Sequence, residues 1–504
     1  MWESETSMEL PQEVKELAKA LKEAGFSAYL VGGCVRDFLM GENPKDWDIA
    51  TSAKPKDIQE IFPESVYENE FGTVLVKTGS EEEGLDIVEV TTFRKENSYS
   101  DHRHPDAVEF TDTIEEDLSR RDFTMNAIAL DIVSDEQIII DPYGGQADIR
   151  AGIIKAVGSP EDRFGEDSLR MMRAVRFAAR FGFDIEAKTK KAIQKQAETL
   201  AEIAPERIRD ELIKLLMTDG AGGGIRLMSE VGLLEQVIPE LQEGVGMEQN
   251  KHHIYTVFEH NVRALEYAVE KGFPLHLRIS SLLHDIGKVG TREWKDDPRG
   301  DRTKKGKKGD WTFYQHQYLG EKIVKEVMNR LKFPKEMIKK VALLVREHMF
   351  VYDPEVVTEK GVRRLLRRVG VENIDDLVKL READRIGSGV PKAQPYRLRD
   401  LQAKIEMAKK EPVGVKQLKI DGKVLMNEVG MKPGPQMGYV LAILLEEVLD
   451  SPELNTEEAL LKRARELMEM DENKLKKMAD KAKEMAREAQ DRVDDAIKEK
   501  YFVK

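Results

Sequence analysis

Cysteine is almost absent from this sequence, because Cys34 is the only one among 504 residues. A single thiol excludes a disulfide framework and fits a reducing compartment. Long apolar runs are absent too: no segment approaches the roughly 18 apolar residues that a membrane-spanning helix needs, and no basic-plus-apolar signal opens the chain. We therefore expect a soluble, cytoplasmic protein that has no membrane partner.

An excess of positive charge is also lacking, since the formal net charge is −14. A protein that grips nucleic acid along its whole length needs clustered Lys and Arg to neutralise phosphates. Any nucleic-acid contact of this chain must therefore be local. The candidate patches are Arg170, Arg173, Arg176 and Arg180 at helical spacing, Arg363, Arg364, Arg367 and Arg368, and the Lys/Arg/Gly stretch 292–308. For 292–308, a solvated loop and a binding patch are equally open interpretations.

The length exceeds what one hydrophobic core serves, so about two to four domains are expected. Helical apolar spacing over 12–24 is followed by strand-like segments, and from about residue 159 the pattern is helical almost to the end. The predicted strands are 29–31, 74–77, 85–92, and 127–130 followed by 138–141. We expect an α+β head with a small mixed sheet, followed by a long all-α body. The predicted domains are 1–155, 156–245, 250–390 and 391–504.

Two carboxylates, Asp46 and Asp48, are spaced i, i+2. On a strand they point to one face while Trp47 points to the other, so both can reach one pair of metal ions. Hard Mg²⁺ ions between paired carboxylates and phosphate oxygens are what phosphoryl or nucleotidyl transfer needs. An isolated Asp-x-Asp is usually a solvated turn, so the interpretation depends on its neighbours.

A glycine-rich turn precedes these carboxylates. Gly32 and Gly33 end an apolar run and permit close backbone approach to a phosphate, and Arg36 adds a donor fork just beyond. A lone Gly-Gly is more often a simple turn. Together with the two carboxylates, however, it forms a set that can hold a nucleoside triphosphate and its metals.

A third carboxylate is offered by the strand-like segment 85–94. Asp86 and Glu89 point to opposite faces of this strand, so only one of them can join the metal site. The residues alone do not choose between the two.

Further polar side chains follow in 118–129, where Arg121, Asp122 and Asn126 have the right chemistry for triphosphate and ribose hydroxyl contacts. A helix over 165–180 would then place Asp167 and Arg170 at i, i+3 on one face. A carboxylate and a guanidinium held side by side can present an acceptor and donors to a base edge.

Histidines and carboxylates gather later in the chain. His284 and Asp285 are adjacent, and His260 and Asp384 flank them at a distance in sequence. Neutral imidazoles and carboxylates of this kind can bind one or two divalent metals. His316 and His348 would supply ligands to a second metal.

Between residues 25 and 240, the ordered motifs resemble the class II nucleotidyltransferases of the polymerase β superfamily, specifically tRNA CCA-adding enzymes and bacterial poly(A) polymerases. The resemblance implies a polymerase β-like head that holds Mg²⁺ on Asp46 and Asp48, with Glu89 as the third carboxylate. It implies that Asp167 and Arg170 replace a nucleic-acid template by pairing with the incoming C or A. The implied nucleotide-binding residues are Gly32, Gly33, Arg36, Arg121, Asp122, Asn126, Asp167, Arg170, Arg173 and Arg176.

Two other segments carry the resemblance further. Residues 94–110 lack periodicity and resemble the flexible loop of enzymes that add the terminal A, and 206–212 resembles a motif that braces the template helix. Residues 250–390 resemble the HD phosphohydrolase superfamily. That resemblance implies a divalent metal of unassigned identity, held by His260, His284, Asp285, His316, His348 and Asp384.

The expected activity is the addition of C, C and A to a tRNA 3′ end with CTP and ATP. One alternative is an enzyme that adds only A, and another is a poly(A) polymerase. An alternative of a different class is an HD phosphohydrolase whose head serves to bind RNA.

Overall fold

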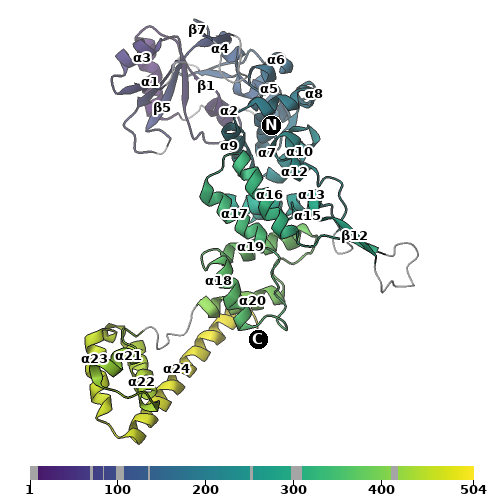
Figure 1. Ribbon diagram of the computed structural model, residues 1–504. Helices are drawn as coiled ribbons and strands as arrows, with labels where there is room; N and C mark the ends of the chain where they lie inside the picture. The colour runs from purple at the N-terminus through teal and green to yellow at the C-terminus, as the bar shows by residue number, and fades with distance from the viewer. Residues whose placement is uncertain are drawn as a thin grey trace. The chain divides into compact units, whose positions relative to one another are not determined.

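The computed structural model describes residues 10–68, 72–82, 84–97, 107–133, 137–249, 254–296, 309–409 and 418–503. The chain divides into two compact units, and Figure 1 shows the ribbon of both. The first unit is 1–346 with 383–390, and the second is 347–382 with 391–504. Among the residues described, no helix combines the length and apolar character needed to cross a membrane.

A seven-stranded sheet forms the centre of the head, in the order β3-β4-β5-β2-β1-β8-β9. Strands β2 and β5 pair in parallel, and the other neighbouring strands pair antiparallel, so the predicted small mixed sheet is confirmed. The strands are β1 (Ala28–Val31), β2 (Asp48–Thr51), β3 (Ser65–Tyr67), β4 (Thr73–Lys77), β5 (Ile87–Thr92), β8 (Ala129–Asp131) and β9 (Ile138–Ile140).

Three predictions of local structure need correction. Strand β5 begins at Ile87 rather than at residue 85, and β8 begins at Ala129 because Thr124–Asn126 form a 3-10 turn. The segment 94–110 is not entirely a loop, since β6 (Arg94–Asn97) and β7 (Ala107–Phe110) pair antiparallel. Residues 98–106, the middle of the predicted flexible loop, lie outside the described residues.

Apolar side chains bury both faces of the sheet. Helix α1 (Gln12–Glu23) places Val14 and Leu21 in the core that also contains Trp47 and Ile49. The helices of the head besides α1 are α2 (Gly33–Leu39), α3 (Pro55–Ile61), α4 (Ile114–Ser119) and α5 (Gly145–Ala151). On the opposite face, Ala50 packs with Phe93 and with residues of α4, while Asp48 stays at the end of the strand. The polar end of β2 is therefore held on a rigid apolar base.

The rest of the first unit is largely helical. Its helices are α6 (Pro160–Glu166), α7 (Leu169–Phe181), α8 (Ala187–Gln196), α9 (Pro205–Leu216), α10 (Ala221–Glu230), α11 (Leu233–Val237), α12 (Pro239–Gln242), α13 (Val257–Glu270), α14 (Leu275–Leu283), α15 (Lys288–Thr291), α16 (His316–Arg330) and α17 (Lys335–Glu347). Buried residues from Leu10 to Val345 form one continuous core. The head and the helices that follow it thus share their packing.

The predicted helix over 165–180 is confirmed from Leu169 onward, but the chain breaks at Asp167 and Ser168 between α6 and α7. Asp167 is extended there, with φ −142° and ψ 102°. Its carboxylate accepts a hydrogen bond from the backbone N–H of Leu169 (3.1 Å) at the start of α7. Short polar side chains that bond to nearby backbone compete with continuous helix, which explains the break.

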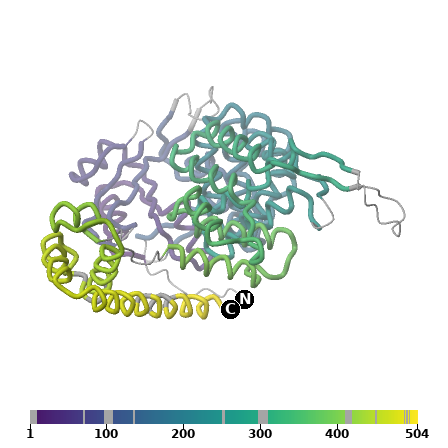
Figure 2. The backbone as a smooth tube through the Cα atoms, turned by 60° about the horizontal axis from the view of Figure 1, so that its bottom comes forward, coloured from purple at the N-terminus to yellow at the C-terminus, as the bar shows by residue number. Residues whose placement is uncertain are grey.

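A hairpin projects from the helical part of the first unit, and both ribbon and tube views show it extending outward (Figures 1 and 2). It consists of β12 (Glu293–Asp296) and β13 (Gly309–Thr312). The second unit has its own apolar core, which includes Leu425, Leu444 and Leu460. The remaining helices are α18 (Glu359–Val369), α19 (Ile374–Gly387), α20 (Tyr396–Lys409), α21 (Gly422–Val429), α22 (Pro435–Asp450), α23 (Glu457–Met468) and α24 (Glu472–Lys500).

Candidate active site

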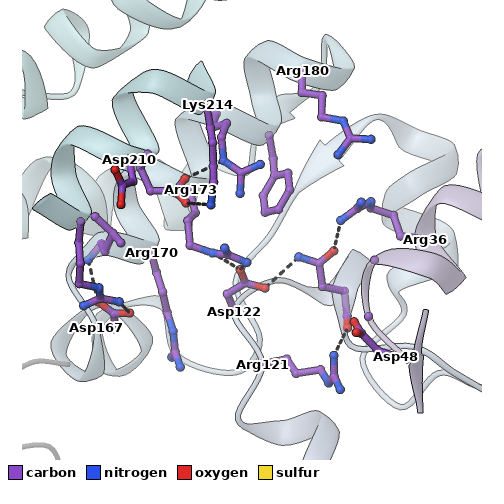
Figure 3. Close-up of a pocket in the computed structure, with 18 of the residues that line it drawn as sticks. Arg36, Asp48, Arg121, Asp122, Asp167, Arg170, Arg173, Arg180, Asp210 and Lys214 are labelled. Carbon is purple, nitrogen blue, oxygen red and sulfur yellow. Dashed lines mark hydrogen bonds and ion pairs between the residues drawn. The ribbon is translucent and has the colours of Figure 1, made fainter. Parts of the chain in front are cut away.

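A cavity of about 750 Å³ lies between the end of the sheet and helices α7 and α9 (Figure 3). The predicted residues that line it are Gly32, Gly33, Arg36, Asp46, Asp48, Arg121, Asp122, Asn126, Asp167, Arg170, Arg173 and Arg176. Segments far apart in the sequence therefore contribute to one polar space.

The register of two strands places the third predicted carboxylate, Glu89, beside Asp48, although Glu89 is not among the residues that line the cavity. Strand β2 begins at Asp48, and the N–H of Glu89 donates to the carbonyl of Trp47 (3.3 Å) just before it. Trp47 packs into the core, so Asp46 and Asp48 lie on the other face as predicted. Asp48 is the direct partner of Glu89 across the parallel pair, and such partners project to the same face. This register favours Glu89 over Asp86, which precedes β5.

The electrostatics of these carboxylates fit a cation-binding site. Burial and the charge of Asp46 raise the pKa of Asp48, although Arg121 opposes the shift. Burial, then Asp48 and Glu68, raise the pKa of Glu89. Like charges crowded in one place disfavour ionisation unless a cation offsets them. The donor set is all oxygen, which suits a divalent metal, as a nucleotidyltransferase head implies.

Gly32 is required by both its conformation and its surroundings. Its φ of 76° lies in the region that other residues rarely adopt, and an added Cβ would stand 2.8 Å from Nη1 of Arg121 and 3.4 Å from Oδ2 of Asp48. A side chain at this position would therefore fill the space beside the carboxylates.

A hydrogen-bonded chain crosses the floor of the cavity, and Figure 3 shows part of it. Arg173 Nη2 lies 2.6 Å from Oδ2 of Asp122, and Asn126 Nδ2 donates to the other carboxylate oxygen (2.9 Å). Asn126 in turn accepts from Nη1 of Arg36 (2.6 Å). Burial would raise the pKa of Asp122, but Arg173 and Asn126 lower it to about 2. Asp122 and Asn126 thus orient the two guanidinium groups.

We expect Asp122→Asn to lower the free energy of unfolding by about 2 kcal/mol at neutral pH. The folded pKa of about 2 is below the unfolded value of 3.8, so the stabilisation is complete above that unfolded value and is lost as the pH falls toward 2. Urea titrations of both proteins at neutral pH and near pH 3 would measure the difference. If the difference in the free energy of unfolding between wild type and Asp122→Asn stayed the same at the lower pH, the ion-pair explanation would be contradicted.

Asp167 and Arg170 both line the cavity, but from opposite sides of the helix break. Arg207 on α9 donates twice to Asp167, through Nη1 (3.3 Å) and Nη2 (2.8 Å). Arg170 donates through Nη1 to Glu166 (2.6 Å). Each member of the predicted template pair is therefore held by its own partner, and no continuous helix face sets their spacing.

The predicted bracing role of the segment 206–212 agrees with these contacts, and Arg176 donates to Glu211 on α9 (2.7 Å). The sequence did not predict that this segment lines the cavity. The lining residues that were not predicted are Arg120, Leu169, Phe177, Arg207, Asp210, Glu211 and Lys214, whereas Arg180, which belongs to a predicted basic patch, also lines the cavity. The α9 members recur at i, i+3, i+4 and i+7, a polar helix face that the sequence displayed.

A second polar cluster is buried in the helical part of the first unit. His260 on α13 places Nε2 2.9 Å from Nε2 of His284, 3.0 Å from Oδ2 of Asp285 and 3.3 Å from Oδ1 of Asp384. His316 Nε2 is 3.0 Å from Oδ1 of Asp285. His260, His284, Asp285 and Asp384 can together offer one ligand atom each to a metal ion. The structure thus brings these predicted ligands together.

The charges of this second cluster also suit a cation. Burial would lower the pKa of His284, but the carboxylates of Asp285 and Asp384 raise it to about 10. Lys288 lies 2.5 Å from Asp285 and donates to Gln249 (2.6 Å), so it steadies the cluster from within the protein. His348 is buried directly after α17 and is the second residue of the second unit, which begins at Glu347. Its role as a ligand stays a prediction.

Comparisons with known proteins place most of the chain in described families. Residues 28–155 match the model of the poly A polymerase head domain, 182–244 match the probable RNA- and SrmB-binding site of polymerase A, and 307–464 match tRNA nucleotidyltransferase domain 2. The last match crosses position 390, and the four predicted domain limits stay predictions.

A CCA-adding enzyme of Ligilactobacillus salivarius is 34% identical over 467 residues, which cover 91% of this chain and 98% of that protein. The crystal structure of a Bacillus stearothermophilus CCA-adding enzyme in complex with CTP is 28% identical with a TM-score of 0.56, covering 90% of this chain and 96% of that one. A Thermotoga maritima CCA-adding enzyme complexed with tRNA, 22% identical with a TM-score of 0.50, shares the fold over 90% of this chain and 93% of its own. The chain therefore belongs to the family of CCA-adding enzymes, the tRNA nucleotidyltransferases with a poly A polymerase head.

Proposed function

We propose that this chain adds C, C and A to the 3′ end of tRNA, with CTP and ATP as donors and without a nucleic-acid template. One observation carries the proposal: a single cavity is lined by the carboxylates of Asp46 and Asp48 and by the Asp167 and Arg170 side chains. A triphosphate bound to the carboxylate end can therefore direct its base toward the pair. Relatives solved with CTP and with tRNA support the same substrates.

In this proposal, Asp46, Asp48 and Glu89 would hold Mg²⁺, which would supply activation of the tRNA 3′ hydroxyl and offset charge on the phosphates. The protein's own side chains and backbone bind and orient the nucleoside triphosphate. Gly32 leaves room for the phosphates, and Arg36 donates to them from the position that Asn126 fixes. Holding the hydroxyl and the α-phosphate in line supplies much of the rate enhancement.

Base choice follows from the donor and acceptor pattern. Cytosine and adenine both present an exocyclic amino group beside a ring nitrogen that accepts. A carboxylate can accept from the amino group while a guanidinium donates to the ring nitrogen. Uracil and guanine present the opposite pattern at these positions, so Asp167 and Arg170 would meet mismatched groups. Unpaired buried polar groups are costly, which gives the pair its selectivity.

The direct test uses three tRNA transcripts, ending at the discriminator base, at C and at CC. Each is incubated with the purified protein, Mg²⁺, and CTP or ATP alone or together. We expect growth by three nucleotides on the shortest transcript when both nucleotides are present. Extension of only the CC-ended transcript with ATP would instead assign an A-adding enzyme, and long A tracts on unrelated RNA would assign a poly(A) polymerase.

A second candidate activity is supported by the buried cluster of His260, His284, Asp285 and Asp384. These residues would hold a divalent metal, which would supply the activation of water needed to hydrolyse phosphomonoesters or cyclic phosphodiesters. Hydrolysis of these esters that persists in Asp48→Asn would assign the activity to this cluster.

A cytoplasmic location remains part of the proposal, in keeping with the single cysteine.

We expect a divalent metal to raise the thermal midpoint of the wild-type protein through this cluster. A ligand present at about 100 times its dissociation constant stabilises the folded state by roughly 2.7 kcal/mol. Scanning calorimetry with added Mn²⁺, Ni²⁺ or Zn²⁺ measures the shift, and His284→Ala should remove most of it. The matched control is His276→Ala on α14, which ends directly before His284. Equal shifts in wild type and His284→Ala would exclude the cluster as the metal site.

A further inference from the structure

The β12–β13 hairpin carries several aromatic and cationic side chains, although the described residues of its strands are not part of a hydrophobic core. Two of the four tryptophans of the chain, Trp294 and Trp311, are direct partners across its strands. Their rings meet edge to face with centroids 5.1 Å apart, and Trp294 is 41% exposed. Tryptophan is enriched at interfaces, because its ring is apolar while its N–H finds a polar partner.

Each face of the hairpin combines an aromatic ring with a cation. On the tryptophan face, the guanidinium of Arg292 lies 3.7 Å from the ring centroid of Trp311. On the other face, Nζ of Lys295 lies 4.5 Å from the ring centroid of Tyr314, which is 66% exposed. Proteins that bind single-stranded nucleic acid combine these two groups: bases stack on the aromatic rings, and the neighbouring cations contact the phosphates.

The charge of the segment favours RNA as the partner. Residues 292–308 contain eight Lys or Arg and four Asp or Glu, in a chain whose net charge is −14. An acidic surface repels RNA, so a contact outside the cavity needs a local basic element such as this one. The buried ring of Phe313 anchors the hairpin 5.6 Å from Lys288, next to the His/Asp cluster. The base of the hairpin is thereby fixed while its strands project.

We infer that the β12–β13 hairpin is a second RNA-contact surface, on which Trp294 and Tyr314 stack bases of a single-stranded segment while Arg292 and Lys295 contact its phosphates. The inference deepens the proposed function, since it takes tRNA as the RNA. It assigns affinity to an element outside the nucleotide cavity. A protein partner on the same surface is the competing explanation, and it predicts unchanged RNA binding when the hairpin is altered.

The test measures anisotropy of labelled tRNA lacking CCA with the full-length protein. Loss of one stacking ring weakens binding roughly 5- to 100-fold, which is the expected effect of Trp294→Ala and of Tyr314→Ala. Trp294→Phe keeps a ring and should stay within roughly twofold of wild type. Phe502→Ala, which removes a 79% exposed ring elsewhere, is the matched control and should change nothing.

Lys295→Gln provides a test that does not depend on hairpin packing, because its side chain is half exposed. Removing one phosphate contact should reduce the slope of log affinity against log salt by roughly 1. Wild-type affinity and slope in folded Trp294→Ala, Tyr314→Ala and Lys295→Gln would overturn the inference. CTP incorporation is measured on the same samples: hairpin-dependent tRNA binding without incorporation would overturn the proposed function alone, and incorporation without hairpin-dependent binding would overturn this inference alone.

Discussion

Asp48→Asn is expected to reduce CTP incorporation on the order of 10³-fold or more, since it removes a ligand of the metals that stabilise transition-state charge. Asp48 contributes directly to the cavity and has Glu89 as its strand partner. The amide keeps the volume but loses the charge, so folding should persist. Single-turnover incorporation of labelled CTP on a tRNA lacking CCA measures the effect. If Asp48→Asn still binds tRNA as wild type does, the lost incorporation reflects a slower chemical step and not weaker tRNA binding.

The strand register provides a matched control for the third carboxylate. Glu89→Gln should also reduce incorporation, by an amount smaller than or equal to that of Asp48→Asn. Asp86→Asn, three residues away and outside β5, should leave the rate at the wild-type value. Full activity of Asp48→Asn would exclude the head as the catalytic centre, and a loss in Asp86→Asn with none in Glu89→Gln would reverse the assignment of the third carboxylate.

Asp167→Ala is expected to lower the preference for CTP over UTP by roughly 10²-fold or more, because a site that hydrogen-bonds its substrate rejects analogues with mismatched groups. The alanine removes the acceptor for the amino group and leaves the triphosphate contacts in place. The ratio of kcat/KM for CTP and UTP, measured separately on the same tRNA, reports the change. An unchanged ratio would remove Asp167 from base selection.

Arg207 is a positioning residue for that carboxylate, since its two hydrogen bonds hold Asp167 at the cavity. Arg207→Ala should shift the same ratio in the same direction by a smaller factor, and Arg207→Lys should restore part of it. Arg209→Ala is the matched control on α9, because Arg209 donates to Asp210 and to the carbonyl of Lys332 and does not line the cavity. A purely structural role for Arg207 would lower kcat for both nucleotides equally.

Several features followed from the sequence because they depend on neighbours along the chain. The i, i+2 spacing of Asp46 and Asp48 fixes their shared face once Trp47 is buried. Gly32 signalled a close approach that only glycine tolerates, and its positive φ agrees. The adjacent His284 and Asp285 likewise predicted a cluster of metal ligands. Local periodicity also indicated the mixed sheet of the head and the helical body.

Other features depended on tertiary structure, because they join segments with no fixed spacing. The parallel register of β2 and β5 places Glu89 rather than Asp86 beside Asp48, and a shift of one residue would have turned Glu89 to the other face of the sheet. Helical spacing predicted Asp167 and Arg170 on one helix, but hydrogen bonding by Asp167 to the backbone broke that helix. Sequence thus determined which side chains were available for the chemistry. Strand register, backbone hydrogen bonds and the packing of α9 against α7 decided which of them meet.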